Sequence, residues 1–360
     1  MFKENWSYNR AELATTTKGI LLYFFLMLLK SPRDLHEGIL RRLFHQKKAQ
    51  VLVSAGFLSI VSEALFQYFA ASGRTERVLS ILSGLPSPKI FIVDEFLSIN
   101  TVKLKMLAQL GPIIYVSQDL ACQRYGYNSN LVAKNLMYKL EREAISLADV
   151  VIACSERDSF MYAEMGAKKV VFYPNIYPVE GFEPSVKDQT PSISIVLRGH
   201  WGSSASRSLE EIFEALSHVH KEIKVYLIGI EPQKVSKNIE LQHIKFVPNK
   251  LGYFRTLSKS WVGINVGIHL AGSNERKYDY ALAGLVVFSD KLGVRGDLLT
   301  HEYTYVDGHD LAAKLDQLLD FGKDQIVAMG TQNRKQAMSL AGKQREKLLE
   351  TINTVLFPKS

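Results

Sequence analysis

Cysteine is scarce in this sequence of 360 residues, which contains only Cys122 and Cys154. Two cysteines do not form the disulfide framework on which small secreted domains depend. Their spacing also fits none of the cysteine and histidine patterns of a zinc site. We therefore expect a reducing, cytoplasmic location.

Long apolar runs are also missing. The N-terminal run Ile20–Leu29 has ten residues, whereas a helix needs about 20 to cross a bilayer. Charged residues follow the run, and no small-residue cleavage site does, so it is not a secretory signal. Two interpretations stay open. The run is a core strand, or it joins the basic residues of 41–48 in a peripheral contact with an anionic membrane, on the inner face of the cell membrane.

Repeats, low-complexity segments and aromatic–basic motifs are absent too. The last absence argues against nucleic acid as a partner, although lysine and arginine exceed aspartate and glutamate by 44 to 36, for a net charge of +8. An Asp-x-Asp motif and a Cys/His cluster are likewise missing. We therefore expect chemistry that needs neither a metal ion nor a cofactor.

The residues that are present indicate an α/β protein. Apolar runs that predict strands, such as Pro88–Asp94 and Pro112–Ser117, alternate with segments of helical periodicity up to about residue 173. This alternation favours a parallel, doubly wound sheet. Prolines and glycines then cluster, and the alternation resumes with the strand Ser192–Leu197. Beyond it we predict a helix over Ser208–His218 and a strand over Ile244–Val247, among others.

These patterns divide the chain into parts of ordinary domain size. We predict two Rossmann-like domains whose parallel sheets face a central cleft, with a C-terminal helix that crosses back to the N-terminal domain. The predicted parts are an N-terminal domain over 1–175, a linker over 176–191, a C-terminal domain over 192–340 and a helix over 341–360.

One stretch, GSNERKYDYALAGLVVFSD, combines a polar loop, a short helix and a buried strand. Ser273 and Asn274 are suitable caps for a helix that begins at Glu275. Gly284 follows the last apolar position of that helix, where a left-handed residue usually ends it. Leu285–Phe288 then predicts a buried strand. The free N–H groups at such a helix start suit a phosphate or a sugar hydroxyl.

Four segments, in this order, resemble the GT-B glycosyltransferases, specifically the family-4-like group that uses activated sugar donors. The segments are Leu140–Glu156, Val170–Pro178, Val196–Leu216 and Arg276–Asp290. The resemblance implies a glycosyltransferase, of the hexosyltransferase type, that moves a sugar from a nucleotide-diphosphate donor to an acceptor hydroxyl. A lipid-linked saccharide in polysaccharide or glycan synthesis is the acceptor we expect.

The resemblance also implies the donor site. Asp279 stands where the family's E-x7-E motif has its second glutamate, which binds the donor ribose, and an ionised carboxylate suits a vicinal diol. The first glutamate is replaced by Ala271 here, and Glu275, one turn before Asp279, is a partial substitute. Alternatively, both acids only stabilise the helix through a favourable interaction with its dipole.

The diphosphate is expected near the start of the C-terminal domain. There Gly199 lets the backbone approach phosphate, and the candidate cations are Arg198, His200 and Arg207. We expect the small polar segment Ser203–Ser206 to be a loop bending around phosphate. Alternatively, the two arginines are solvated side chains at the start of a helix and bind no phosphate.

A catalytic base is expected only if the reaction inverts the anomeric centre, which the sequence leaves open. Asp119 follows a predicted strand and is the first candidate, and Glu95 is the second. The alternative for Asp119 is a helix cap. Two other functions remain: a nucleotide-sugar epimerase of the same fold, and a catalytically silent nucleotide-sugar-binding protein.

Overall fold

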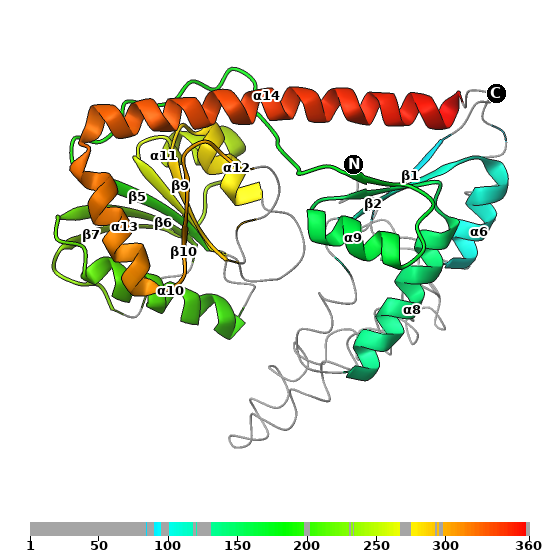
Figure 1. The fold of residues 1–360 in the computed structure, drawn as a ribbon, viewed down its shortest axis with the longest axis horizontal. Helices are drawn as coiled ribbons and strands as arrows, with labels where there is room; N and C mark the ends of the chain where they lie inside the picture. Colours follow the sequence, from blue (N-terminus) through cyan, green and yellow to red (C-terminus); the bar gives the residue numbers. More distant parts are fainter. Residues whose placement is uncertain are drawn as a thin grey trace, which may run out of the picture. The chain divides into compact units, whose positions relative to one another are not determined.

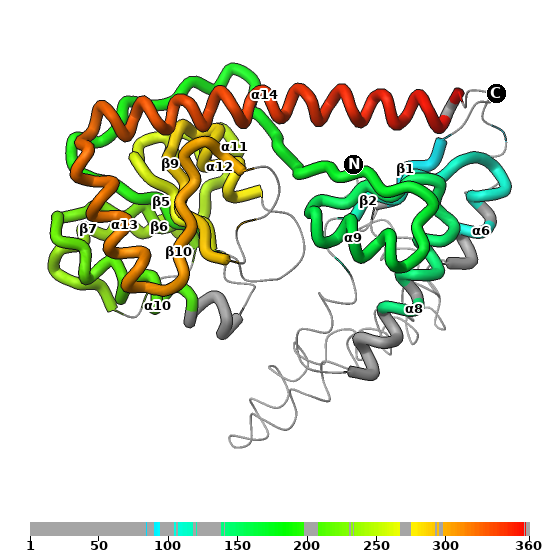
Figure 2. The backbone as a smooth tube through the Cα atoms, viewed as in Figure 1, coloured from blue at the N-terminus to red at the C-terminus, as the bar shows by residue number. Residues whose placement is uncertain are grey.

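The computed structural model describes residues 90–94, 101–117, 131–197, 202–229, 234–266, 275–291 and 298–357, together with the single residues 84, 120, 232 and 294. Figure 2 draws the chain as a tube, with the residues of uncertain placement in grey. The elements predicted before residue 70, and with them the run Ile20–Leu29, lie outside the described residues.

The chain divides into two compact units. The second comprises Phe172–Ser360 together with the short stretch Ala153–Ser159, and the first comprises the remainder. In the N-terminal half, four strands form one sheet in the order β1-β2-β3-β4 (Figure 1). The strands are β1 Phe91–Asp94, β2 Ile113–Ser117, β3 Val150–Ala153 and β4 Val170–Phe172, and the helices are α6 Thr101–Leu110, α8 Leu131–Leu147 and α9 Glu156–Glu164.

The second unit contains a parallel sheet of six strands in the order β10-β9-β8-β5-β6-β7. The strands are β5 Ser192–Leu197, β6 Ile223–Gly229, β7 Ile239–Ile244, β8 Val262–Asn265, β9 Val286–Asp290 and β10 Glu302–Tyr305. The helices are α10 Gly202–Ser217, α11 Lys250–Leu257, α12 Glu275–Leu282, α13 Gly308–Asp320 and α14 Lys323–Leu356.

Both faces of this sheet are covered, as the uninterrupted apolar runs predict. Ile193 and Ile195 of β5 point into a core cluster with apolar residues of α10 and α13. Val196 points the other way, into a second cluster with residues of α11, α12 and α14. This alternation is the period of two that a strand imposes on its side chains.

The segment predicted as a linker, 176–191, has no helix or strand. It lies along α14 in the opposite direction, as Figure 2 shows. Gln344 exchanges hydrogen bonds of 3.2 Å with the backbone of Ile176, and Arg334 donates one of 2.9 Å to the carbonyl of Phe182. Both Ile176 and Phe182 are buried in the second core cluster. The segment is therefore a packed strap of the second unit.

Two strands of this unit differ from the sequence prediction. The strand expected at Ile244–Val247 ends where it was expected to begin, because β7 is an edge strand of mixed burial and lacks an uninterrupted apolar run. Strand β10 was not predicted. Helix α14 runs without a break from Lys323 to Leu356.

Candidate functional site

The strand order of the second unit reverses between β5 and β8. From β5 the chain moves outward to β6 and β7, and from β8 it moves outward to β9 and β10. In open α/β sheets, ligands bind beyond the carboxyl ends of the strands at such a switch point. Here those ends are Leu197 and Asn265. The segments that follow them, 198–201 and 267–274, are those in which the sequence predicts most of the donor site.

Most of the predicted site residues lie outside the described residues: Glu95, Asp119, Arg198, Gly199, His200, Ser273 and Asn274. Their flanking strands are described. The strands that precede Glu95 and Asp119 are β1 and β2, which are parallel neighbours with Asp94 opposite Val116.

Helix α12 begins at Glu275 and ends at Leu282, as predicted. Gly284 has φ of 76°, which confirms the left-handed stop. Glu275 is exposed at the first position, and Asp279 is half-buried one turn later. The structure therefore places both acids on the helix that starts beyond the switch point.

Asp279 has a neighbour that the sequence did not reveal, Tyr253 of α11. Burial raises the pKa of Tyr253 well above its ordinary value, and the charge of Asp279 and a hydrogen bond to it raise the pKa further. Tyr253 therefore keeps its proton at neutral pH and donates to the Asp279 carboxylate. A tyrosine in an apolar helical pattern looks like a core residue, so the sequence carries no signal for this pair.

Two side chains of α12 bind the end of β5. The Tyr280 hydroxyl accepts a hydrogen bond of 2.9 Å from the Val196 N–H, and Arg276 donates one of 3.1 Å to the Val196 carbonyl. Burial raises the pKa of Tyr280, although Arg276 opposes this shift. The ring of Tyr280 lies so close to Gly263 of β8 that a Cβ there would overlap it. Helix α12 is thereby locked against both strands of the switch point.

The segment after β5 differs from the prediction. Helix α10 begins at Gly202, six residues before the predicted start, so Ser203–Ser206 is helical and is not a loop. Arg207 lies in the second turn of this helix. Among the described residues of α10, the apolar stripe that faces the core begins at Leu209, so periodicity gives no sign of the turns before it. Only the four residues 198–201 then separate β5 from a helix N-terminus, which is an arrangement that suits phosphate.

Among the residues that the structure describes, no three or more His, Cys, Asp or Glu side chains are grouped so as to hold a metal ion. Within that same part of the chain, no helix is both long and apolar enough to cross a bilayer.

Comparisons with known proteins give structural matches alone. No protein-family model matches the chain, and no curated protein matches its sequence. A sucrose-phosphate synthase from Thermosynechococcus elongatus is 13% identical, with 79% of each chain covered and a TM-score of 0.56. A UDP-forming α,α-trehalose-phosphate synthase from Burkholderia vietnamiensis is 11% identical, with 86% of this chain and 81% of that one covered and a TM-score of 0.61.

A similar UDP-forming synthase from Burkholderia xenovorans, in complex with glucose-6-phosphate, is 11% identical over 83% of this chain and 81% of its own, with a TM-score of 0.58. At such low identity, these likenesses show the fold. They confirm the predicted α/β class with two parallel sheets, of the GT-B type. Membership of the family-4-like group stays a prediction.

Proposed function

We propose that this protein is a glycosyltransferase that moves a sugar from a nucleotide-diphosphate donor to an acceptor hydroxyl. The observation that carries the proposal is the position of Asp279, on a helix that is locked to both strands of the switch point of a GT-B sheet. The printed names of two structural neighbours, which are UDP-forming synthases, support a nucleotide donor.

In this proposal the C-terminal domain holds the donor. Asp279 accepts hydrogen bonds from the ribose hydroxyls, as an ionised carboxylate, which only accepts, can do for a vicinal diol. The diphosphate lies at the starts of α10 and α12, where free N–H groups stabilise its negative charge. The residues proposed around it are Arg198, Gly199, His200, Arg207, Ser273, Asn274 and Glu275.

Catalysis then consists mainly of positioning and of charge stabilisation as the diphosphate departs, without a metal ion. If the reaction inverts the anomeric centre, Asp119 takes the proton of the acceptor hydroxyl, with Glu95 as the second candidate. We assign the acceptor to the N-terminal domain and propose a lipid-linked saccharide. The supporting observation is the apolar run Ile20–Leu29 beside basic residues, which suits a cytoplasmic protein that touches an anionic membrane.

A thermal-shift screen with UDP, GDP, ADP and their sugar conjugates tests the donor site. We expect at least one nucleotide to raise the melting temperature, since a ligand that binds only the folded state stabilises it. The proposal fails if none does. Analysis of the sugar products without acceptor separates transfer from epimerisation, because an epimerase would form a new sugar isomer. Binding without turnover would indicate the silent binding protein.

The variant Asp279→Ala tests the ribose contact. Loss of hydrogen bonds to a charged group costs about 1.5–3 kcal/mol, so nucleotide affinity should fall roughly 10- to 100-fold. Tyr253→Phe is the matched control, because it keeps the Asp279 carboxylate and removes only the hydroxyl group that donates to it. We expect this control to bind nucleotide within a few-fold of the wild type. Equal affinity of Asp279→Ala and wild type, measured by calorimetry, would refute the assignment of Asp279.

A further inference from the structure

A buried ion pair joins the first turn of α12 to the start of β10. The Lys277 ammonium lies 2.9 Å from a carboxylate oxygen of Glu302, and both side chains are fully buried. Burying two charges is costly, and apolar side chains of similar volume often stabilise a fold as well or better. The need for a packed core therefore does not account for this pair.

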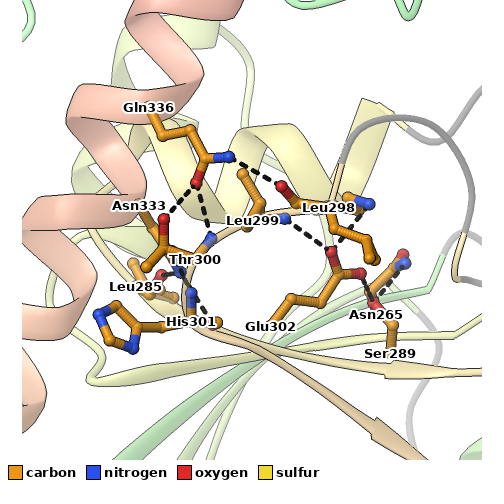
Figure 3. A network of polar contacts seen from close by, with 11 residues as sticks. Asn265, Leu285, Ser289, Leu298, Leu299, Thr300, His301, Glu302, Asn333 and Gln336 are labelled. Atoms are coloured by element: carbon orange, nitrogen blue, oxygen red, sulfur yellow. Dashed lines mark hydrogen bonds and ion pairs between the residues drawn. The ribbon is translucent and has the colours of Figure 1, made fainter.

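The Glu302 carboxylate is hydrogen-bonded on both oxygens (Figure 3). Oε1 accepts a bond of 2.9 Å from the Ser289 hydroxyl, and Oε2 accepts one of 3.2 Å from the Leu299 N–H. The Ser289 hydroxyl in turn accepts a bond of 3.3 Å from the side-chain amide of Asn265. The ion pair thus belongs to a connected network that spans α12, β8, β9 and β10.

Side-chain amides of α14 hold the backbone just before Glu302 (Figure 3). Asn333 accepts a hydrogen bond of 2.9 Å from the His301 N–H and donates one of 3.0 Å to the His301 carbonyl. Gln336 accepts one of 2.6 Å from the Thr300 N–H. Glu302 is therefore a fixed point to which Lys277 binds.

The network also holds both flanks of the candidate donor segment 267–274. Asn265 is the last residue of β8, before that segment, and Lys277 is the third residue of α12, after it. Asn265 binds Ser289, Lys277 binds Glu302, and Ser289 and Glu302 are hydrogen-bonded to each other. A directional ion pair fixes the position of a helix end more narrowly than apolar contacts do.

We propose that Lys277 and Glu302 are positioning residues of the nucleotide site, which hold the start of α12, and with it Asp279, in the geometry that binds the donor. This inference rests on the proposed function. It assigns the buried pair to recognition of the nucleotide as well as to the fold.

The double variant Lys277→Met/Glu302→Leu separates these two roles, because it removes both charges and keeps apolar volume. Binding of UDP, GDP and ADP is measured by calorimetry, and unfolding by thermal melting. Each single substitution should lower both stability and affinity, since it leaves one buried charge without its partner. The double variant should melt near the wild-type temperature and bind the best of the three nucleotides roughly tenfold more weakly. Wild-type affinity in the double variant overturns the inference.

Lys221→Met is the matched control, because it breaks an exposed ion pair with Asp320 of similar N–O distance, 2.8 Å. This variant should bind nucleotide as the wild type does. If the double variant does not fold, Ser289→Ala decides the question, because it leaves the ion pair in place and removes one hydroxyl, which donates to Glu302 and accepts from Asn265. A several-fold weaker affinity supports the inference and an unchanged affinity overturns it. A wild-type chain that binds none of the three nucleotides contradicts the proposed function itself.

Discussion

Asp279 shows what sequence resemblance finds and what it misses at the scale of single residues. Its position on a helix that begins at Glu275 follows from the cap residues and from the glycine stop at Gly284, which are local signals. Its partner Tyr253 comes from another helix, and only the packing of α11 beside α12 brings the two together. Long-range pairs of this kind have no pattern in a single sequence, and the buried pair of Lys277 and Glu302 is another.

Lys187, in the strap, is a buried amine whose titration is measurable. It donates hydrogen bonds of 2.7 Å and 2.8 Å to the carbonyls of Ser260 and Gly284, and a longer one of 3.5 Å to that of Ala283. A neutral amine keeps two N–H groups, which suffice for the two short bonds. Burial lowers the pKa of Lys187 to about 7, although the negative charge of Asp188 partly raises it. In the unfolded chain, the pKa of a lysine is about 10.4.

Between these two pKa values the unfolded chain holds a proton that the folded protein has released, so the free energy of unfolding rises with pH in this window. Relative to Lys187→Met, the wild type should gain about 2–3 kcal/mol between pH 7 and pH 9.5. Urea unfolding of both proteins at the two pH values measures this gain. A pH-independent difference would contradict the lowered pKa of Lys187.

At the scale of elements, the central strands and the helices with a continuous apolar stripe are predictable. Strand β5 has the predicted bounds, because its apolar pattern extends along its full length. The prediction fails where an element extends beyond its apolar pattern. The residues of α10 before Leu209 and those of the edge strand β7 show no continuous apolar pattern, so periodicity gives no signal for their bounds.

The contact of α12 with β8 gives a prediction at this scale. Gly263→Ala places a methyl group against the ring and Cβ of Tyr280, and such overpacking costs about 1–3 kcal/mol. It should also weaken nucleotide binding, because Tyr280 ties α12 to Val196. Denaturant unfolding and calorimetry measure the two effects.

Gly342→Ala provides the matched control for this prediction. Gly342 lies within α14, and a Cβ there meets no atom within 4 Å. Alanine in a helix is more stable than glycine by roughly 0.5–1 kcal/mol, so this variant should be slightly stabilised. Equal stability of Gly263→Ala and the wild type would show that the contact with Tyr280 relaxes without cost.

At the scale of the whole molecule, the sequence predicts a parallel α/β fold of two parts because alternating patterns recur on both sides of a proline-rich segment. The pattern does not reveal to which part that segment belongs. Pro174 to Pro191 lacks periodicity and looks like an exposed linker, yet its apolar residues Ile176 and Phe182 are buried in the second unit. Periodicity cannot detect irregular backbone that packs as a strap.

The strap therefore decides which fragment folds. A fragment of residues 172–360 keeps the strap, and we expect it to unfold cooperatively and to bind nucleotide. A fragment of residues 192–360 lacks Ile176 and Phe182, and loss of two buried apolar side chains costs roughly 3 kcal/mol or more. Thermal melting of the two fragments measures the difference. Equal stability would show that the strap contributes nothing to the core.

The hydrogen bonds that join Tyr280 and Arg276 of α12 to Val196 affect how this protein can acquire a new donor specificity. Strand pairing between β5 and β8 extends as far as Ile195 opposite Ile264, and the next peptide unit is held by Arg276 and Tyr280. The segments 198–201 and 267–274 thus adjoin one preassembled base, which is formed by Val196, Arg276 and Tyr280. We expect their sequences to be exchangeable between relatives as a matched set, so that donor preference can be engineered by grafting 198–201 and 267–274 while the base stays intact.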